Sequence, residues 1–114
     1  MVVIEAFIKP HKLDDVKEAL EELGVGGMTV VEVMQETESR PRGRAFGTGR
    51  GPTDLVPKIR LEIAVPDGLA ERIIEAICLH GSSGKTEEGK ILVTPIHGAV
   101  RIRTGEADEE ALSI

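Results

Sequence analysis

The feature that most constrains the fold is a strict alternation of apolar and polar residues over Pro57–Pro66. Aliphatic side chains stand at every second position, namely Ile59, Leu61, Ile63 and Val65. The charged residues Lys58, Arg60 and Glu62 alternate with the first three of them, and Ala64 precedes Val65. Because successive side chains of a strand point to opposite faces, this segment predicts a half-buried β-strand. The chain must then build a sheet covered on one face, and the other face is either a polar surface or the inside of an oligomer.

Two amphipathic helices are predicted by apolar residues at helical spacing. The first covers His11–Leu23, and Gly24 follows its last turn. The second begins at Asp67 as N-cap and runs to Gly81. Their inward stripes are Leu13, Val16, Leu20 and Leu23 in the first helix, and Leu69 or Ala70, Ile73, Ile74 and Ile77 in the second.

Three further segments are predicted to be strands because they are rich in β-branched residues. They are Val2–Ile8, Met28–Val33 and Lys90–Thr104, the last interrupted at Pro95 and Gly98. The resulting order is strand, helix, strand, strand, helix, strand. It predicts a single α+β domain over residues 1–114 with the ferredoxin-like βαββαβ arrangement, in which both helices cover one face of an antiparallel sheet.

Length and charge exclude several classes of protein. A chain of 114 residues can bury one core, and oligomerisation would help so small a domain. The net charge of −6 and the presence of only two aromatic residues, Phe7 and Phe46, argue against nucleic-acid binding. No apolar run approaches membrane-spanning length, and the N-terminus lacks the features of a signal peptide. The acidic tail, Gly105–Ile114, is expected to be frayed.

Cysteine and histidine usage gives no sign of catalysis. The only cysteine, Cys78, lies in an apolar helical pattern and is expected to be a buried structural thiol, which fits a reducing cytoplasm. His11, His80 and His97 fall in different segments, so we predict neither catalytic nor metal-binding residues. An enzyme is the competing hypothesis, since ferredoxin-like folds also carry catalysts.

The segment Gly81–Lys90 is rich in glycine, serine and lysine, a composition suited to an anion site. Glycines let backbone N–H groups approach a ligand, and Lys85 and Lys90 add positive charge. Downstream, Arg101 and Arg103 would share one face of a strand, so four cations could converge on one ligand. A solvated connection between a helix and a strand is the plain alternative.

The segment Gln35–Val56 has no periodicity and joins the second and third predicted strands. Its arginines lie among glycines and are Arg40, Arg42, Arg44 and Arg50. Loops of this length are usually functional or disordered. One hypothesis is a solvated hairpin extension, and the other is a basic arm that engages an acidic protein partner or a small anion.

Taken together and in this order, these features resemble the PII signal-transduction family over nearly the whole chain. The matching motifs are Ile8–Pro10, Lys12–Val16, Gly27–Thr29, Pro57–Lys58, Glu62, Val65–Pro66, Ser83–Lys85, Gly89–Lys90 and Arg101–Glu106. The resemblance implies a homotrimer whose sheets face inward, with clefts for ATP, ADP or AMP between subunits. It also implies a partner-binding T-loop at about residues 36–56, a B-loop at about 81–90 and a C-terminal segment at about 101–114.

The resemblance further implies three sets of site residues. The nucleotide would be bound by Gly27, Met28, Thr29, Glu62, Ala64, Ser83, Gly84, Lys85, Gly89, Lys90, Arg101 and Arg103. A small anion, either 2-oxoglutarate or bicarbonate, would be bound by Lys58, Ser39 and Arg40. A protein partner would contact the T-loop at Arg40, Arg42, Arg44, Phe46 and Arg50.

Departures from the family pattern affect the expected ligands. Members that sense 2-oxoglutarate carry glycines and a magnesium-binding glutamine at the T-loop base, where this chain has Gln35, Thr37 and Ser39. This predicts impaired magnesium-bridged binding of 2-oxoglutarate. Glu87 replaces a B-loop glycine and adds negative charge, so ADP or AMP is expected to bind better than ATP. The chain has no tyrosine, so the T-loop tyrosine that many members uridylylate is missing.

Two functions within the family follow from these features. The leading hypothesis is a non-enzymatic adenylate sensor linked to inorganic-carbon metabolism, because Lys58 and the loop arginines suit a small anion such as bicarbonate. The alternative is a nitrogen regulator that senses ATP, ADP and 2-oxoglutarate and controls an ammonium channel or a nitrogen-assimilation enzyme.

Overall fold

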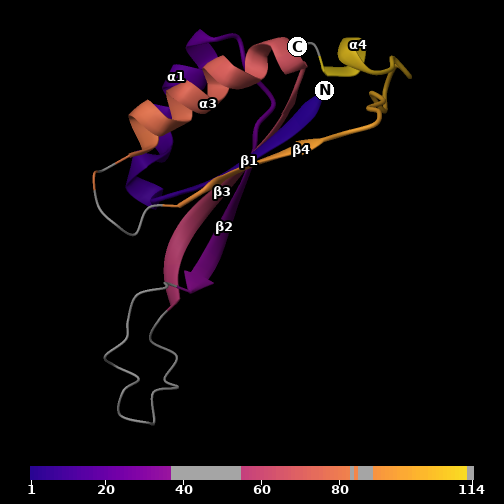
Figure 1. Ribbon diagram of the computed structural model, residues 1–114. Coiled ribbons are helices and arrows are strands. Elements are labelled where there is room, and N and C mark those ends of the chain that lie inside the picture. Colours follow the sequence, from indigo (N-terminus) through magenta and orange to yellow (C-terminus); the bar gives the residue numbers. More distant parts are fainter. Residues whose placement is uncertain (37–54, 83, 85–88, 113–114) are drawn as a thin grey trace, which may run out of the picture.

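The structure, a computed structural model, describes residues 1–36, 55–82, 84 and 89–112. Its centre is an antiparallel four-stranded sheet with the strand order β2-β3-β1-β4 (Figure 1). The strands are β1 (Val2–Ile8), β2 (Thr29–Glu36), β3 (Leu55–Val65) and β4 (Ile91–Pro95). This order and this pairing confirm the predicted ferredoxin-like arrangement.

Two helices pack against each other on one face of the sheet (Figure 1). The helical elements are the 3₁₀ turn η1 (Pro10–Lys12), α1 (Leu13–Glu22), α3 (Asp67–Gly81) and the short α4 (Glu109–Leu112). The first predicted helix, His11–Leu23, therefore overlaps η1 at its start. Proline fixes its own φ in the helical range and lacks an N–H, which suits the first position of such a turn.

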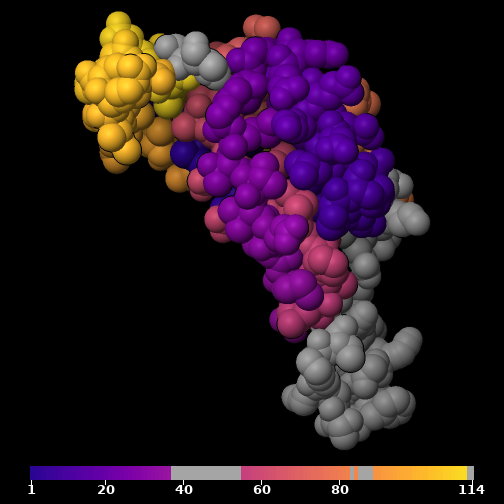
Figure 2. Space-filling view, turned by 180° about the vertical axis from the view of Figure 1, so that it is seen from behind, coloured from indigo at the N-terminus to yellow at the C-terminus, as the bar shows by residue number. Residues whose placement is uncertain are grey.

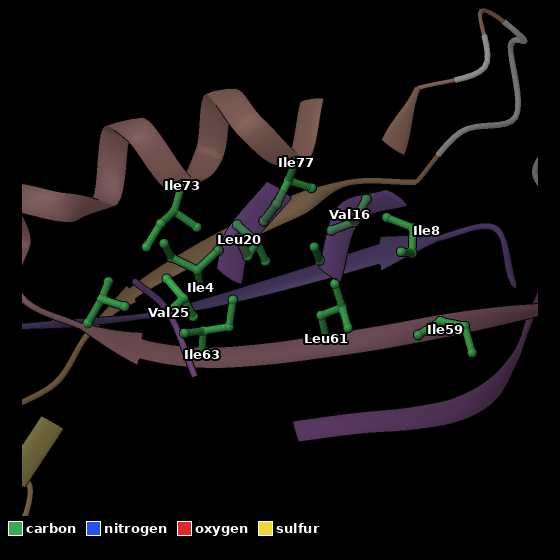
Figure 3. Close-up of a cluster of buried hydrophobic side chains, with 12 residues drawn as sticks. Ile4, Ile8, Val16, Leu20, Val25, Ile59, Leu61, Ile63, Ile73 and Ile77 are labelled. Atoms are coloured by element: carbon green, nitrogen blue, oxygen red, sulfur yellow. The ribbon is translucent and has the colours of Figure 1, made fainter. Parts of the chain in front are cut away.

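The hydrophobic core lies between the two helices and the sheet (Figure 3). Ile4 and Leu61 from the strands, and Leu20 and Ile73 from the helices, are each 0% exposed. The aliphatic residues of the alternating segment all belong to this core: Ile59, Leu61, Ile63 and Val65. The predicted inward face of β3 is therefore confirmed, and hydrophobic burial is the main force that fixes the sheet against the helices.

The end of α1 brings the chain into β2 through a glycine-dependent turn. Gly24 has a φ of +88°, and its N–H donates to the carbonyl of Glu21. The N–H of Val25 reaches back to the carbonyl of Leu20, which completes a Schellman-type cap. This geometry confirms the predicted position of Gly24, buries Val25, and delivers Gly27 to the start of β2.

Two predictions on α3 are wrong. Pro66, not Asp67, is the N-cap; Asp67 is the first helical residue, and its Oδ1 accepts a hydrogen bond from the Met1 amino group at 2.8 Å. Cys78 is exposed instead of buried. Each helical residue turns by about 100°, so a residue next to the buried Ile77 points away from the core.

The C-terminal segment is also more structured than predicted. Val100 and Ala107 form an isolated β-bridge, and the Asp108 N–H donates to the carbonyl of Ala99 at 2.7 Å. Helix α4 follows directly. The expectation that Gly105–Ile114 is frayed is therefore wrong for residues 105–112, because backbone hydrogen bonds to Ala99 and Arg101 hold a segment that lacks any long apolar pattern.

The uncovered face of the sheet is mixed in character. Residues directly opposite each other in a sheet share a face, so the partners of the charged β3 residues lie on this face too; they include Val33 opposite Lys58 and Val31 opposite Arg60. Lys58 is only 6% exposed, and Arg60 Nε lies 3.6 Å from Oε2 of Glu5 on β1. The charged side chains of this face are therefore partly buried and lie against neighbouring polar side chains, unlike those of a freely solvated surface.

Candidate functional site

The far end of the predicted B-loop is fixed against β1. The Phe7 N–H donates to the carbonyl of Lys90 at 3.1 Å. A Cβ on Gly89 would lie 2.0 Å from the carbonyl oxygen of Phe7, so no larger residue fits at this position without a backbone shift. Lys90 is exposed and borders an open cleft of about 420 Å³, whose apolar wall includes Ile74 and Ile77 of α3.

The near end of the same loop makes a glycine-dependent turn. Gly84 has a φ of +79°, and its N–H donates to Oγ of Ser82 at 3.3 Å. Left-handed backbone of this kind is strained for residues with a Cβ. The turn therefore depends on glycine at position 84, and its N–H is engaged by the Ser82 hydroxyl. Anion binding by this loop stays a prediction.

A second cleft, of about 270 Å³, joins three of the predicted nucleotide residues. Gly27 stands before β2 with a φ of +68°, Ala64 lies on β3, and Arg101 follows β4. Helix α4 completes the wall with Ala111 and Leu112. Figure 2 shows this C-terminal segment, in orange and yellow, as a lobe at one end of the molecule.

Pairing between strands brings two more predicted residues together. Thr29, the first residue of β2, lies directly opposite Glu62 of β3, and both therefore lie on the uncovered face of the sheet. Met28 precedes them and packs, partly buried, against the core. The family motif around residues 27–29 and the acidic residue of β3 thus share one end of the β2–β3 pair.

The predicted strand geometry of Arg101 and Arg103 is wrong. Residues 102–104 form a turn, closed by hydrogen bonds from the Arg101 N–H to the Glu106 carbonyl and from the Gly105 N–H to the Arg101 carbonyl, each 2.8 Å. Gly105 has a φ of +76°, which permits the turn. Arg101 lines the second cleft, whereas Arg103 is an exposed turn residue, so the two do not share a strand face.

Within one chain, Lys90 and Arg101, two of the predicted cations in the described part of the chain, also fail to converge on one ligand. Lys90 lies beside Phe7 near the end of β1, whereas Ala64, in the cleft of Arg101, pairs with Val3 near its start. Four residues of strand separate these positions by about 13 Å. Two groups of predicted nucleotide residues are therefore separated in the described part of the chain, one around Lys90 and one around Arg101.

Comparison with known proteins identifies the family. Residues 1–106 match the family described as "Nitrogen regulatory protein P-II". The chain belongs to the P-II family. It is 43% identical to the nitrogen regulatory protein P-II of Haemophilus influenzae and 43% identical to that of Azospirillum brasilense. It is 40% identical to nitrogen regulatory protein P-II 1 of Escherichia coli, and each comparison covers 98% of this chain and 100% of the relative.

Membership of the P-II family confirms the resemblance found in the sequence, but many of the residues it implicates lie outside the described part of the chain. From the T-loop these are Ser39, Arg40, Arg42, Arg44, Phe46 and Arg50, together with Thr37. From the B-loop they are Ser83, Lys85 and Glu87. Their roles as nucleotide, anion or partner contacts stay predictions.

Lys58, which the family pattern predicts to bind a second anion, lies in the described part of the chain. Its Nζ lies 3.4 Å from Oε1 of Gln35, which stands near the end of β2. Both side chains therefore lie on the two strands that lead into the T-loop. Lys58 is buried, and the Gln35 side chain provides a polar neighbour for its ammonium, as buried charges require. Among the described helices, none is long and apolar enough to cross a membrane.

Four residues that line or support the Arg101 cleft are absent from the predicted set: Gly26, Ile63, Ala111 and Leu112. Small or apolar wall residues carry no chemical signature in a sequence. The one available signal was Asp108 to Glu110, because acidic residues before an apolar pair favour the start of a helix.

Proposed function

We propose that this chain is a non-enzymatic nitrogen-regulatory protein that forms a homotrimer and binds ADP, AMP and ATP in clefts between subunits. It would regulate a protein partner through the T-loop. The observation that carries this proposal is the cleft that unites Gly27, Ala64 and Arg101 in a chain of the P-II family.

The division of the site into two groups supports a cleft between subunits. In one chain the Lys90 group and the Arg101 group lie near opposite ends of β1. A neighbouring copy that covers the mixed face of the sheet would bring its Arg101 group to the first chain's Lys90. Each cleft would then hold a guanidinium fork and an ammonium against the phosphates, a combination that favours bidentate and point-charge contacts together.

The nitrogen-regulatory hypothesis is now preferred to the inorganic-carbon hypothesis. The relatives compared above, at 40–43% identity, are named nitrogen regulatory proteins. We therefore propose 2-oxoglutarate as the second ligand, with one carboxylate on Lys58, and an ammonium channel or nitrogen-assimilation enzyme as the kind of partner. Ligand would shift the population of T-loop conformations, because Lys58 and Gln35 stand on the strands that carry the loop.

Calorimetric titration tests this proposal directly. ADP and AMP are each titrated into the purified protein, and ATP is titrated with Mg²⁺ in the presence and absence of 2-oxoglutarate or bicarbonate. We expect ADP and AMP to bind better than ATP. We expect 2-oxoglutarate to raise ATP affinity by only about fivefold, at the low end of typical coupling between sites, because Ser39 replaces the magnesium-binding glutamine of the family pattern. Sedimentation analysis of the same sample should give the mass of a trimer.

The same titration separates the competing hypotheses. A response to bicarbonate without a response to 2-oxoglutarate would restore the inorganic-carbon hypothesis. A monomer that binds no adenine nucleotide would overturn the proposed function altogether.

A further inference from the structure

In the turn that follows β4, the side chains of Thr104, Glu106 and Arg101 contact one another, and the proposed function gives no role to Thr104 or Glu106. The hydroxyl of Thr104 donates to Oε1 of Glu106 at 3.0 Å, and the Glu106 N–H donates to the same hydroxyl at 3.2 Å. Oε1 of Glu106 also lies 3.1 Å from Nε of Arg101. One carboxylate oxygen therefore links the turn to the arginine that lines the second cleft.

The backbone holds the two charged residues opposite each other. Arg101 N–H donates to the Glu106 carbonyl, and the bridge between Val100 and Ala107 flanks this bond. The pairing is thus fixed by the main chain, and the two side chains need little further ordering to meet. This differs from an ordinary surface ion pair, in which two long side chains lose rotamer freedom to form one contact.

Contacts with Glu106 and Glu110 fix how the guanidinium of Arg101 is oriented. The Glu106 carboxylate forms an ion pair with Nε of Arg101, although the N–H of Nε does not point at the carboxylate oxygen as it would in a hydrogen bond. The Nη2 atom lies 3.5 Å from the carbonyl oxygen of Glu110 in α4, whose next two residues wall the cleft. The guanidinium is therefore held on two sides by the C-terminal segment, at the wall of the cleft that a phosphate would enter.

We infer that Glu106 is a positioning residue for Arg101, which orients the guanidinium toward the phosphates of a bound nucleotide. This inference rests on the proposed nucleotide site and names a residue that would act through Arg101 without touching the ligand. A negative charge so close could instead repel phosphate. The side chains of Arg101 and Glu106 are 33% and 47% exposed, however, so water and salt screen that repulsion. The entropy cost of ordering a mobile Arg101 side chain upon binding is not reduced by screening.

The test is the ADP affinity of the full-length Glu106→Gln protein, measured by calorimetry. Glutamine keeps the size and an acceptor for Thr104 but removes the charge that pairs with Arg101. We expect ADP to bind about three- to tenfold more weakly, the range expected when one long side chain is no longer held in place. Thr104→Val removes the hydroxyl that fixes Glu106 and should weaken ADP binding in the same direction by a smaller factor.

Three further measurements separate positioning from general effects. Glu109→Gln removes the same charge from an exposed position on α4 and should leave ADP affinity unchanged. Adenosine, which lacks phosphate, should bind the wild-type protein and Glu106→Gln equally well. In an Arg101→Ala background, Glu106→Gln should have no additional effect on ADP, because the group it positions is gone.

The possible failures are distinguishable. If the wild-type protein binds no ADP, the proposed function is overturned and this inference with it. If wild-type binds ADP and Arg101→Ala weakens it, while Glu106→Gln binds ADP normally or more tightly, the inference alone is overturned. An equal loss for adenosine and ADP would likewise show that Glu106 does not act through the phosphates.

Discussion

Replacing Gly89 by alanine is expected to destabilise the protein by about 3 kcal/mol or more, at the upper end of the range for overpacked interiors. The added Cβ would lie 2.0 Å from the carbonyl oxygen of Phe7 and 2.8 Å from its carbonyl carbon. Neither atom can move easily, because β1 is hydrogen-bonded to β3 on one side and to β4 on the other. Urea unfolding followed by circular dichroism would measure the loss.

Gly68→Ala provides the matched control for this substitution. Gly68 lies in the first turn of α3, and a Cβ there would meet no atom within 4 Å. Alanine should therefore be neutral or stabilise the protein by roughly 0.5–1 kcal/mol, the usual gain over glycine in a helix. If the two variants were equally stable, Gly89 would not pack closely against β1, and the position described for Lys90 would be wrong.

Arg101→Ala is expected to weaken ADP binding by about 1.5–3 kcal/mol, or roughly 10- to 150-fold, as for loss of a hydrogen bond to a charged group. Its side chain is one-third exposed and lies outside the core, so the free energy of unfolding should change little. Calorimetry with ADP and urea unfolding on the same preparation would establish both points.

Arg72→Ala is the control for loss of charge. Arg72 is exposed on α3, does not line the Arg101 cleft, and carries the same charge as Arg101. Its replacement should leave ADP affinity within a factor of about two, because solvent and salt screen an exposed charge that does not line the cleft. An unchanged affinity of Arg101→Ala would remove the second cleft from the nucleotide site.

Sequence periodicity predicted those strands and helices in which the spacing of apolar residues along the segment determines which face is buried. The alternation over β3 and the stripes of α1 and α3 each place apolar side chains on one face, and those faces form the core. The same patterns underestimated the strands near the T-loop, where β2 extends to Glu36 and β3 begins at Leu55. Cross-strand hydrogen bonds extend these strands past the end of their apolar pattern.

The C-terminal segment could not be predicted in the same way. Its turn depends on the backbone hydrogen bond between Arg101 and Glu106 and on the positive φ of Gly105, which allow a β-rich sequence to bend back. The position of α4 is set by contact with β3, which no local pattern reveals. The resemblance supplied Gly27 and Ala64, and charge and spacing had already indicated Arg101 and Lys90. Only the three-dimensional arrangement separated the Arg101 cleft from Lys90.

The separation of the two residue groups along β1 has a consequence for mixed assemblies. If each cleft takes Lys90 from one chain and Arg101 from the next, an Arg101→Ala chain and a Lys90→Ala chain each keep the half that the other lacks. Neither variant alone would contain an intact cleft, yet trimers co-assembled from equal amounts of both should regain roughly a quarter of their clefts, since closed rings repeat one heterologous interface. Defects in this protein would then complement one another between subunits, and a single damaged chain would disable only the clefts to which it contributes its damaged half.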